Sequence, residues 1–113
     1  MRILILEDST ERVKYFLERF SDYELTITEN AQDAIIYLNE EMYDYVFLDH
    51  DLGLNNGSGS DVASYLGSGM TINSDAKVII HSWNIPACAL MLRLCPGAFV
   101  LPYGSDAFFG LEI

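Results

Sequence analysis

The segment from Tyr45 to Gly53, with the sequence YVFLDHDLG, decides the fold of this chain. Its first four residues are apolar and of β-forming types, which is typical of a strand that is buried on both faces. The charged residues Asp49, His50 and Asp51 follow this strand directly. Such a strand indicates a parallel sheet that has a polar site at the carboxyl ends of its strands.

The rest of the chain alternates short apolar runs with helical patterns. Four further strands are expected, at residues 2–6, 24–28, 77–80 and 98–101. Apolar residues recur at helical spacing after Ser9 and after Asn30, and each of these two residues can cap a helix. A shorter helix is expected at residues 60–66, and another begins near Pro86 and reaches about Leu94.

Strands that alternate with single helices indicate βαβ units, and therefore one α/β domain over residues 1–113. We expect a five-stranded parallel sheet of the flavodoxin-like order 2-1-3-4-5, with helices on both faces. Little chain follows the last strand, so the final helix is expected to be truncated. An apolar face near Phe108 and Phe109 would then be exposed, which predicts a homodimer or a protein partner at the C-terminal region.

The net charge of the chain limits which nucleic acids it is expected to bind. The 113 residues carry a net charge of −11, from 17 acidic and 6 basic residues. The basic residues form no run, so duplex DNA is not expected to bind. A small anionic nucleotide, or one end of an RNA strand, needs only one or two cations and is compatible with this charge.

The apolar segments predict a cytoplasmic protein. No apolar run approaches the roughly 18 residues that are needed to span a bilayer, so no membrane association is expected. The apolar run at the N-terminus ends at Glu7 and Asp8 without a cleavage site, so it is not a signal peptide. Cys88 and Cys95 lie about two turns apart in one predicted helix, too far for a disulfide, and are expected to be core residues.

Most of the reactive side chains follow three of the predicted strands. In open α/β sheets, ligands bind outside the carboxyl ends of the strands, where the strand order reverses. The residues at that edge are Glu7 and Asp8 after the first strand, Asp49, His50 and Asp51 after the third, and His81, Ser82 and Asn84 after the fourth. Both histidines of the chain are in this group.

These residue types are suited to chemistry on a phosphoester. We expect His50 and His81 to act as general acid and base, with Asp49 and Asp51 as further catalytic residues. The predicted phosphate ligands are Arg12, Ser82 and Asn84. The predicted ligands of a metal ion, Mg²⁺ or Mn²⁺, are Glu7, Asp8 and Asp49.

Each of these residues also has a structural interpretation. The alternatives are helix capping for Glu7, Asp8, Ser82 and Asn84, a solvated ion pair for His50, and a hydrogen-bonded core position for His81. Trp83 is interpreted as a core or rim aromatic, with stacking on a base as the alternative.

Residues 1–104 resemble the receiver domain of response regulators. The resemblance rests on Glu7 and Asp8 after the first strand, Asp49 followed by Leu52 and Gly53, and Ser82 after the fourth strand. It implies that Glu7 and Asp8 help to hold Mg²⁺, that Asp49 is a phosphoacceptor and that Ser82 is a hydroxyl switch residue. Receivers have a Lys before the Pro that follows the fifth strand, where this chain has Leu101. That Lys neutralises the phosphoryl group, so phosphorelay is disfavoured.

The chain more closely resembles receiver-like domains that process cyclic phosphates. The shared motifs are Glu7, Asp8 and the following Arg12, the LDHDLG stretch at residues 48–53, and the HSxN stretch at residues 81–84. The resemblance implies action on cyclic phosphate ends of RNA or related nucleotides. The first hypothesis is therefore a phosphoester hydrolase, and the second is a non-enzymatic pseudo-receiver that serves as a signalling or interaction module. The second histidine favours the enzyme, since an adaptor does not need one at the sheet edge.

Overall fold

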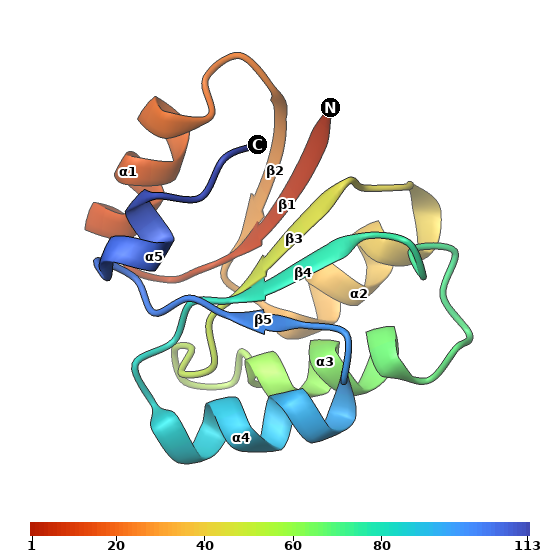
Figure 1. Cartoon of the computed structure of the whole chain (residues 1–113). Coiled ribbons are helices and arrows are strands. Elements are labelled where there is room, and N and C mark those ends of the chain that lie inside the picture. The colour runs from red at the N-terminus through yellow and green to blue at the C-terminus, as the bar shows by residue number, and fades with distance from the viewer.

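A parallel sheet forms the middle layer of the computed structural model, which describes all 113 residues (Figure 1). The strands are β1 (Arg2–Leu6), β2 (Glu24–Thr28), β3 (Tyr45–Leu48), β4 (Lys77–Ile80) and β5 (Phe99–Val100). They pair in the order β2-β1-β3-β4-β5, and every pair is parallel. The predicted fold class and strand order are confirmed.

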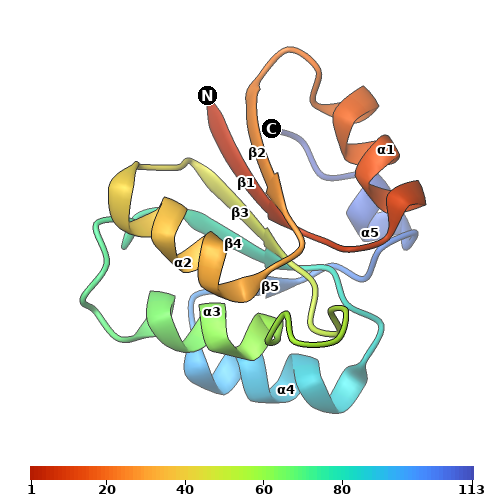
Figure 2. The same ribbon diagram turned by 180° about the vertical axis from the view of Figure 1, so that it is seen from behind.

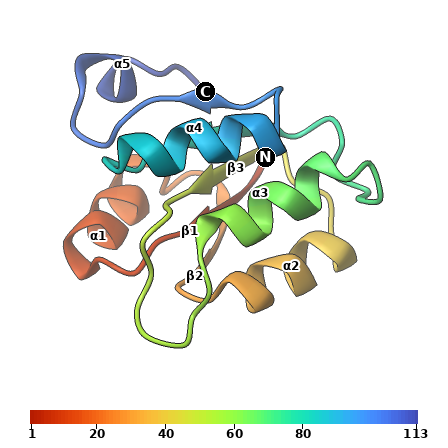
Figure 3. The same cartoon turned by 90° about the horizontal axis from the view of Figure 1, so that it is seen from below.

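Five helices cover the two faces of the sheet. They are α1 (Thr10–Arg19), α2 (Ala31–Glu40), α3 (Gly59–Gly67), α4 (Ile85–Leu94) and α5 (Asp106–Phe109). Helices α2, α3 and α4 lie side by side on one face, whereas α1 and α5 cover the other (Figures 2 and 3). No helix is long and apolar enough to cross a membrane.

The alternation of side chains along the strands divides the core into two clusters. An aliphatic cluster lies between the sheet and helices α2 to α4, and includes Leu4, Val46 and Ile80. An aromatic cluster lies on the α1 and α5 side, and includes Phe16 and Phe47. Successive residues of a strand point to opposite faces, so each strand contributes to both clusters.

The helices begin close to the predicted residues. Ser9 and Asn30 cap α1 and α2, because each side chain accepts a hydrogen bond from a backbone N–H of the first turn. Helix α3 begins at Gly59, one residue earlier than predicted, because Ser58 and Asp61 form a capping box. The predicted strand at residues 98–101 is too long, since β5 has only two residues.

The C-terminal end is only partly as expected. Helix α5 has four residues, as the predicted truncation requires. The prediction that Phe108 and Phe109 form an exposed apolar face is wrong for Phe108. This side chain is buried in the aromatic cluster against Phe16 and Tyr103. Phe109 is half exposed, and a homodimer or protein partner at this end stays a prediction. Cys88 and Cys95 are buried and unpaired.

Two glycines allow α3 to approach its neighbours closely. A Cβ atom on Gly67 would lie 1.7 Å from the carbonyl oxygen of Leu94 in α4, and one on Gly59 would lie 1.9 Å from the carbonyl oxygen of Asp49. Both distances are far below van der Waals contact, so a side chain at either position requires backbone movement. Gly59 therefore holds the start of α3 against the end of β3.

Gly67→Ala is expected to lower the free energy of unfolding by roughly 1–3 kcal/mol, the usual cost of overpacking. The clash is with backbone, which has no side-chain rotamer to relieve it. Urea denaturation of the variant beside wild type measures the change. Gly97→Ala is the matched control, because a Cβ there meets no atom within 4 Å. Equal denaturation midpoints for the two variants would contradict the close α3–α4 contact.

Candidate functional site

A polar cavity of about 290 Å³ lies at the carboxyl end of the sheet. Its lining residues come from the β1–α1, β3–α3 and β4–α4 junctions and are Glu7, Asp8, Ser9, Arg12, Asp49, Asp51, Ser82, Trp83 and Asn84. Four of these are acidic and one is basic. The cavity therefore lies where the sequence predicts the site.

The floor of the cavity holds a buried hydrogen bond between Glu7 and His81. His81 Nε2 lies 2.9 Å from Glu7 Oε1, and both side chains are at most 1% exposed. Glu7 Oε2 accepts the backbone N–H groups of Asp8 and Ser9, each at 3.0 Å. Burial alone would raise the pKa of Glu7, but the hydrogen bonds from His81 and Ser9 lower it below its ordinary value. Glu7 is therefore a carboxylate, and His81 Nε2 is the donor.

The His81 ring packs against the aromatic cluster on one side and contacts Glu7 of the site on the other. Its centroid lies 5.3 Å from that of Phe16 and 6.3 Å from that of Phe47. Its Nδ1 is buried and has no hydrogen-bond partner. The only polar contact of this imidazole is therefore Glu7, from the end of the strand two places away in the sheet.

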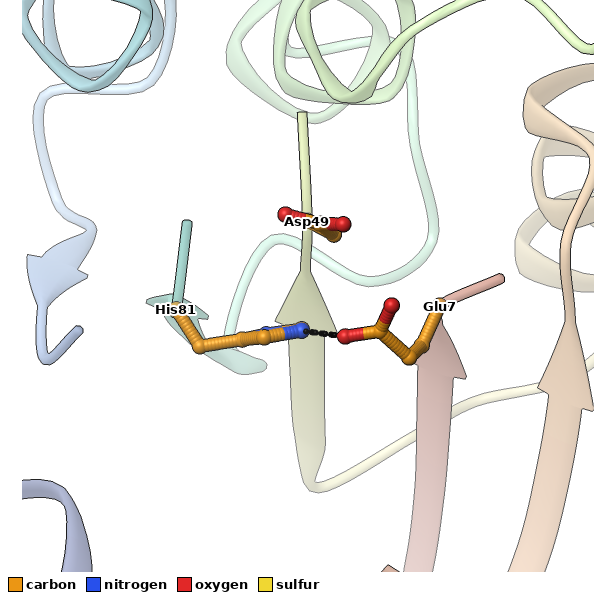
Figure 4. A group of neighbouring side chains, drawn as sticks. All are labelled: Glu7, Asp49 and His81. Carbon is orange, nitrogen blue, oxygen red and sulfur yellow. Dashed lines mark hydrogen bonds and ion pairs between the residues drawn. The ribbon is translucent and has the colours of Figure 1, made fainter. Parts of the chain in front are cut away.

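Asp49 follows β3, between the strand ends that carry Glu7 and His81 (Figure 4). Its side chain is buried, and ligand atoms of the three residues lie within 4.8 Å of one another. Burial and the negative charge of Glu7 raise the pKa of Asp49 to about 6. Asp49 is therefore a carboxyl group that faces the cavity and changes protonation state close to neutral pH.

Two further carboxylates lie on the rim. Asp8 is exposed overall, but its carboxyl group loses part of its hydration in the fold. This loss and the negative charge of Glu7 raise the pKa of Asp8. Asp51 Oδ1 lies 3.0 Å from His50 Nδ1, and the Asn84 amide donates to both oxygens of Asp51 at 3.3 and 3.4 Å. The hydrogen bond from His50 is the main cause of the lowered pKa of Asp51. His50 thus orients Asp51 and does not line the cavity itself.

Arg12 is the only basic residue that lines the cavity. Its Nη1 lies 3.6 Å from Glu7 Oε1, and its guanidinium carbon lies 4.4 and 4.7 Å from the ring centroids of Trp83 and Tyr103. The indole N–H of Trp83 donates to the carbonyl oxygen of Tyr103 at 2.6 Å. Two aromatic rings and one carboxylate therefore hold the guanidinium in place.

Ser82 and Asn84 shape the start of α4. Asn84 Oδ1 accepts the backbone N–H of Ala87 at 3.1 Å, so the capping interpretation of Asn84 is confirmed. With its amide group donating to Asp51, little of this side chain is free for a ligand. Ser82 Oγ accepts the backbone N–H of Asn84 at 3.0 Å, which leaves the hydroxyl proton of Ser82 available to the cavity.

The structure gathers most of the predicted site residues but separates the two histidines. Seven predicted residues line the cavity, namely Glu7, Asp8, Arg12, Asp49, Asp51, Ser82 and Asn84. His81 does not line the cavity, because its fully buried imidazole is hydrogen-bonded to Glu7, and its catalytic role stays a prediction. His81 continues the alternation of β4 and points, like Ile79, to the aromatic cluster. Tyr103 is a site residue that sequence reasoning missed.

The carboxylates fit a divalent cation of the Mg²⁺ or Mn²⁺ type. Carboxylate oxygens are the ligands that such hard cations prefer, and the cavity has an excess of them over its single guanidinium. Both oxygens of Glu7 are already engaged by hydrogen bonds. Of the predicted metal ligands, Asp8 and Asp49 therefore remain available, and Asp51 lines the same cavity.

Comparisons with known proteins point to one family and to one fold. The family model for the cyclic-phosphate processing receiver domain matches residues 2–96. No curated protein gives a significant match.

Solved structures of response regulators share the fold. The complex of response regulator TrrA from Thermotoga maritima with Mg²⁺ and BeF is 23% identical, with 96% of this chain and 92% of that chain aligned and a TM-score of 0.73. A CheY-like receiver domain protein from Methanospirillum hungatei is 18% identical, with 96% and 85% aligned and a TM-score of 0.75. The phosphorylated cyanobacterial phytochrome response regulator RcpA is 16% identical, with 96% and 84% aligned and a TM-score of 0.78.

Asp49→Asn is expected to stabilise the protein at neutral pH. The pKa of Asp49 is raised from its ordinary value of 3.8 to about 6. The folded state therefore binds more protons than the unfolded state between these values, so this carboxyl lowers stability as pH rises through that window. Above pH 6 the free energy of unfolding of the variant should exceed that of wild type by on the order of 1–3 kcal/mol. Below about pH 4 the two should be equal.

Urea denaturation at several pH values measures this difference, and the exposed Asp22→Asn is the control. A gain that does not change with pH would contradict the raised pKa of Asp49.

His81→Ala is expected to destabilise the protein by about 3–5 kcal/mol, because Glu7 would keep a buried charge without its main partner. In a protein that already carries Glu7→Gln, His81→Ala should lower the free energy of unfolding by clearly less. His50→Ala breaks only the rim contact with Asp51 and should cost under about 1 kcal/mol. A double-mutant cycle by urea denaturation measures the coupling. No coupling between Glu7 and His81 would show that their contact does not support the fold.

Proposed function

The chain belongs to the cyclic-phosphate processing receiver domain family, and we propose that its site hydrolyses a cyclic phosphodiester. The observation that carries the proposal is that Asp49 and Arg12 line one cavity. A carboxyl group with a pKa of about 6 is suited to proton transfer near neutral pH. A fixed guanidinium in the same cavity is suited to an anionic phosphoryl group.

The proposed reaction opens the ring of the substrate. A water oxygen attacks phosphorus, and one ester P–O bond of the ring breaks, which gives a phosphate monoester and a free hydroxyl. The water loses a proton and the leaving oxygen gains one, so the site needs one proton acceptor and one donor. Asp49 takes the proton of the water, and the protonated Asp49 then returns a proton to the leaving oxygen.

The remaining residues bind the phosphoryl group and orient the attacking water. Arg12 balances the charge of the phosphoryl oxygens, and its contacts with Trp83 and Tyr103 mean that little reorganisation is needed during the reaction. The free hydroxyl proton of Ser82 donates to a phosphoryl oxygen. Asp51, held by His50 and Asn84, accepts a hydrogen bond from the attacking water. In this proposal His50 acts through Asp51, and His81 acts through Glu7.

The cavity is too acidic to admit a phosphate on its own. Its four acidic side chains outnumber the single guanidinium, so an anion would be repelled. Mg²⁺ or Mn²⁺ held by Asp8 and by the phosphoryl oxygens of the substrate would neutralise this charge and polarise a phosphoryl oxygen, and Asp49 would stay free for proton transfer. We therefore propose that substrate binding depends on a divalent cation.

Phosphorelay through Asp49 has weaker support. Leu101, which takes the place of the receiver Lys, does not line the cavity and packs beside the aromatic cluster. Strand β5 therefore contributes no cation to the lining of the cavity. A non-enzymatic pseudo-receiver remains the alternative that the experiment below separates from the hydrolase.

The test is turnover of nucleoside 2′,3′-cyclic phosphates and of short RNA that ends in a cyclic phosphate, with Mg²⁺, Mn²⁺ or EDTA. Wild type should turn over at least one substrate with metal and none with EDTA. Asp49→Asn should reduce kcat about 100- to 10,000-fold, the usual contribution of a general acid or base. Asp22→Asn, on the exposed surface, should match wild type. Folded wild type without turnover under all conditions would favour the pseudo-receiver.

A further inference from the structure

Trp83 is the only tryptophan of the chain, and it lies on the rim of the cavity with 66% of its surface exposed. Single exposed apolar side chains are common and need no explanation. Trp83 differs because it is fixed as well as exposed. Its indole N–H donates to the Tyr103 carbonyl, and one ring face lies against the Arg12 guanidinium.

The other face of the indole has no aromatic or cationic partner in the structure. Aromatic faces that are held rigid beside a phosphate site are suited to stacking on a base, since every base has a π face. Ile85, two residues further on and the first residue of α4, is also strongly exposed. The β4–α4 junction thus places exposed apolar surface next to a cavity that is otherwise polar.

We propose that the open face of Trp83 stacks on the nucleobase of a substrate whose cyclic phosphate is bound in the cavity. This rests on the proposed function and narrows it, because the substrate class becomes nucleoside cyclic phosphates and not cyclic phosphates of base-free sugars. The base belongs either to a mononucleotide or to the 3′-terminal residue of an RNA strand. Stacking does not distinguish base edges, so little preference among the bases is expected.

The single tryptophan allows a direct binding test. Asp49→Asn, which keeps the substrate intact, is titrated with adenosine and uridine 2′,3′-cyclic phosphates, with methyl riboside 2,3-cyclic phosphate, which has no base, and with inorganic phosphate, all with Mg²⁺. The nucleotides should quench Trp83 emission saturably, and the two base-free ligands should not. Equal changes for ligands with and without a base would overturn the proposal. A cyclic-phosphate-ended oligonucleotide distinguishes an RNA end from a mononucleotide by its affinity.

Variants at Trp83 separate stacking from support of Arg12. Isothermal titration is used here, because Trp83→Leu and Trp83→Phe lose the fluorophore. Trp83→Leu should weaken binding of the cyclic nucleotides about tenfold or more, and binding of the base-free cyclic phosphate much less. Trp83→Phe should retain most of the affinity. An equal loss for both ligand types would mean that Trp83 only positions Arg12, and no loss for either would also overturn the proposal.

The outcomes for this proposal and for the hydrolase are distinguishable. Quenching that depends on the base, without turnover by wild type, would support stacking and reject hydrolysis. Turnover of nucleotide and base-free cyclic phosphates with the same kcat/KM would support hydrolysis and reject the role of Trp83.

Discussion

The hydrogen bond between Glu7 and His81 is the contact on which the chemistry of this molecule depends. It joins the ends of β1 and β4 beneath the cavity, and neither side chain is exposed to solvent. A buried carboxylate is costly without partners, and His81 supplies one that the aromatic cluster holds in place. Burial and the retained charge of Glu7 together raise the pKa of Asp49, and the same charge attracts Arg12. One buried contact thus contributes both to the raised pKa of Asp49 and to the position of the Arg12 guanidinium.

The site differs from that of a receiver mainly in where its positive charge comes from. The strand-5 position that carries Lys in receivers is Leu101 here, and the guanidinium of Arg12 enters from α1 instead. Trp83 and Tyr103 hold that guanidinium, so its position depends on the β4–α4 junction and on the segment after β5. The cavity therefore receives its positive charge from α1 and not from β5. This placement of the guanidinium supports the proposed action on a phosphoester.

Strand order, sheet edge and most cavity residues were predictable, because buried strands such as Tyr45–Leu48 end abruptly in acidic residues. The orientation of His81 was also present in the pattern, since it continues the alternation of Ile79 toward the aromatic face. The contact of Tyr103 with Arg12 could not be predicted from the sequence, because it joins distant segments that share no periodic pattern. The extent of β5 was overestimated because its apolar pattern continues through Leu101, although only Phe99 and Val100 pair with β4.

The short β5 has a consequence for how this sheet ends. An exposed edge strand presents unpaired N–H and C=O groups to which strands of other molecules can add, and long apolar edges promote aggregation. Here the edge strand has two residues, and Pro102, which has no N–H to donate, follows soon after it. A neighbouring chain would find too few hydrogen-bonding groups in register to extend the sheet, even though Phe99 is exposed. The two-residue β5 is therefore a poor template for intermolecular β-pairing.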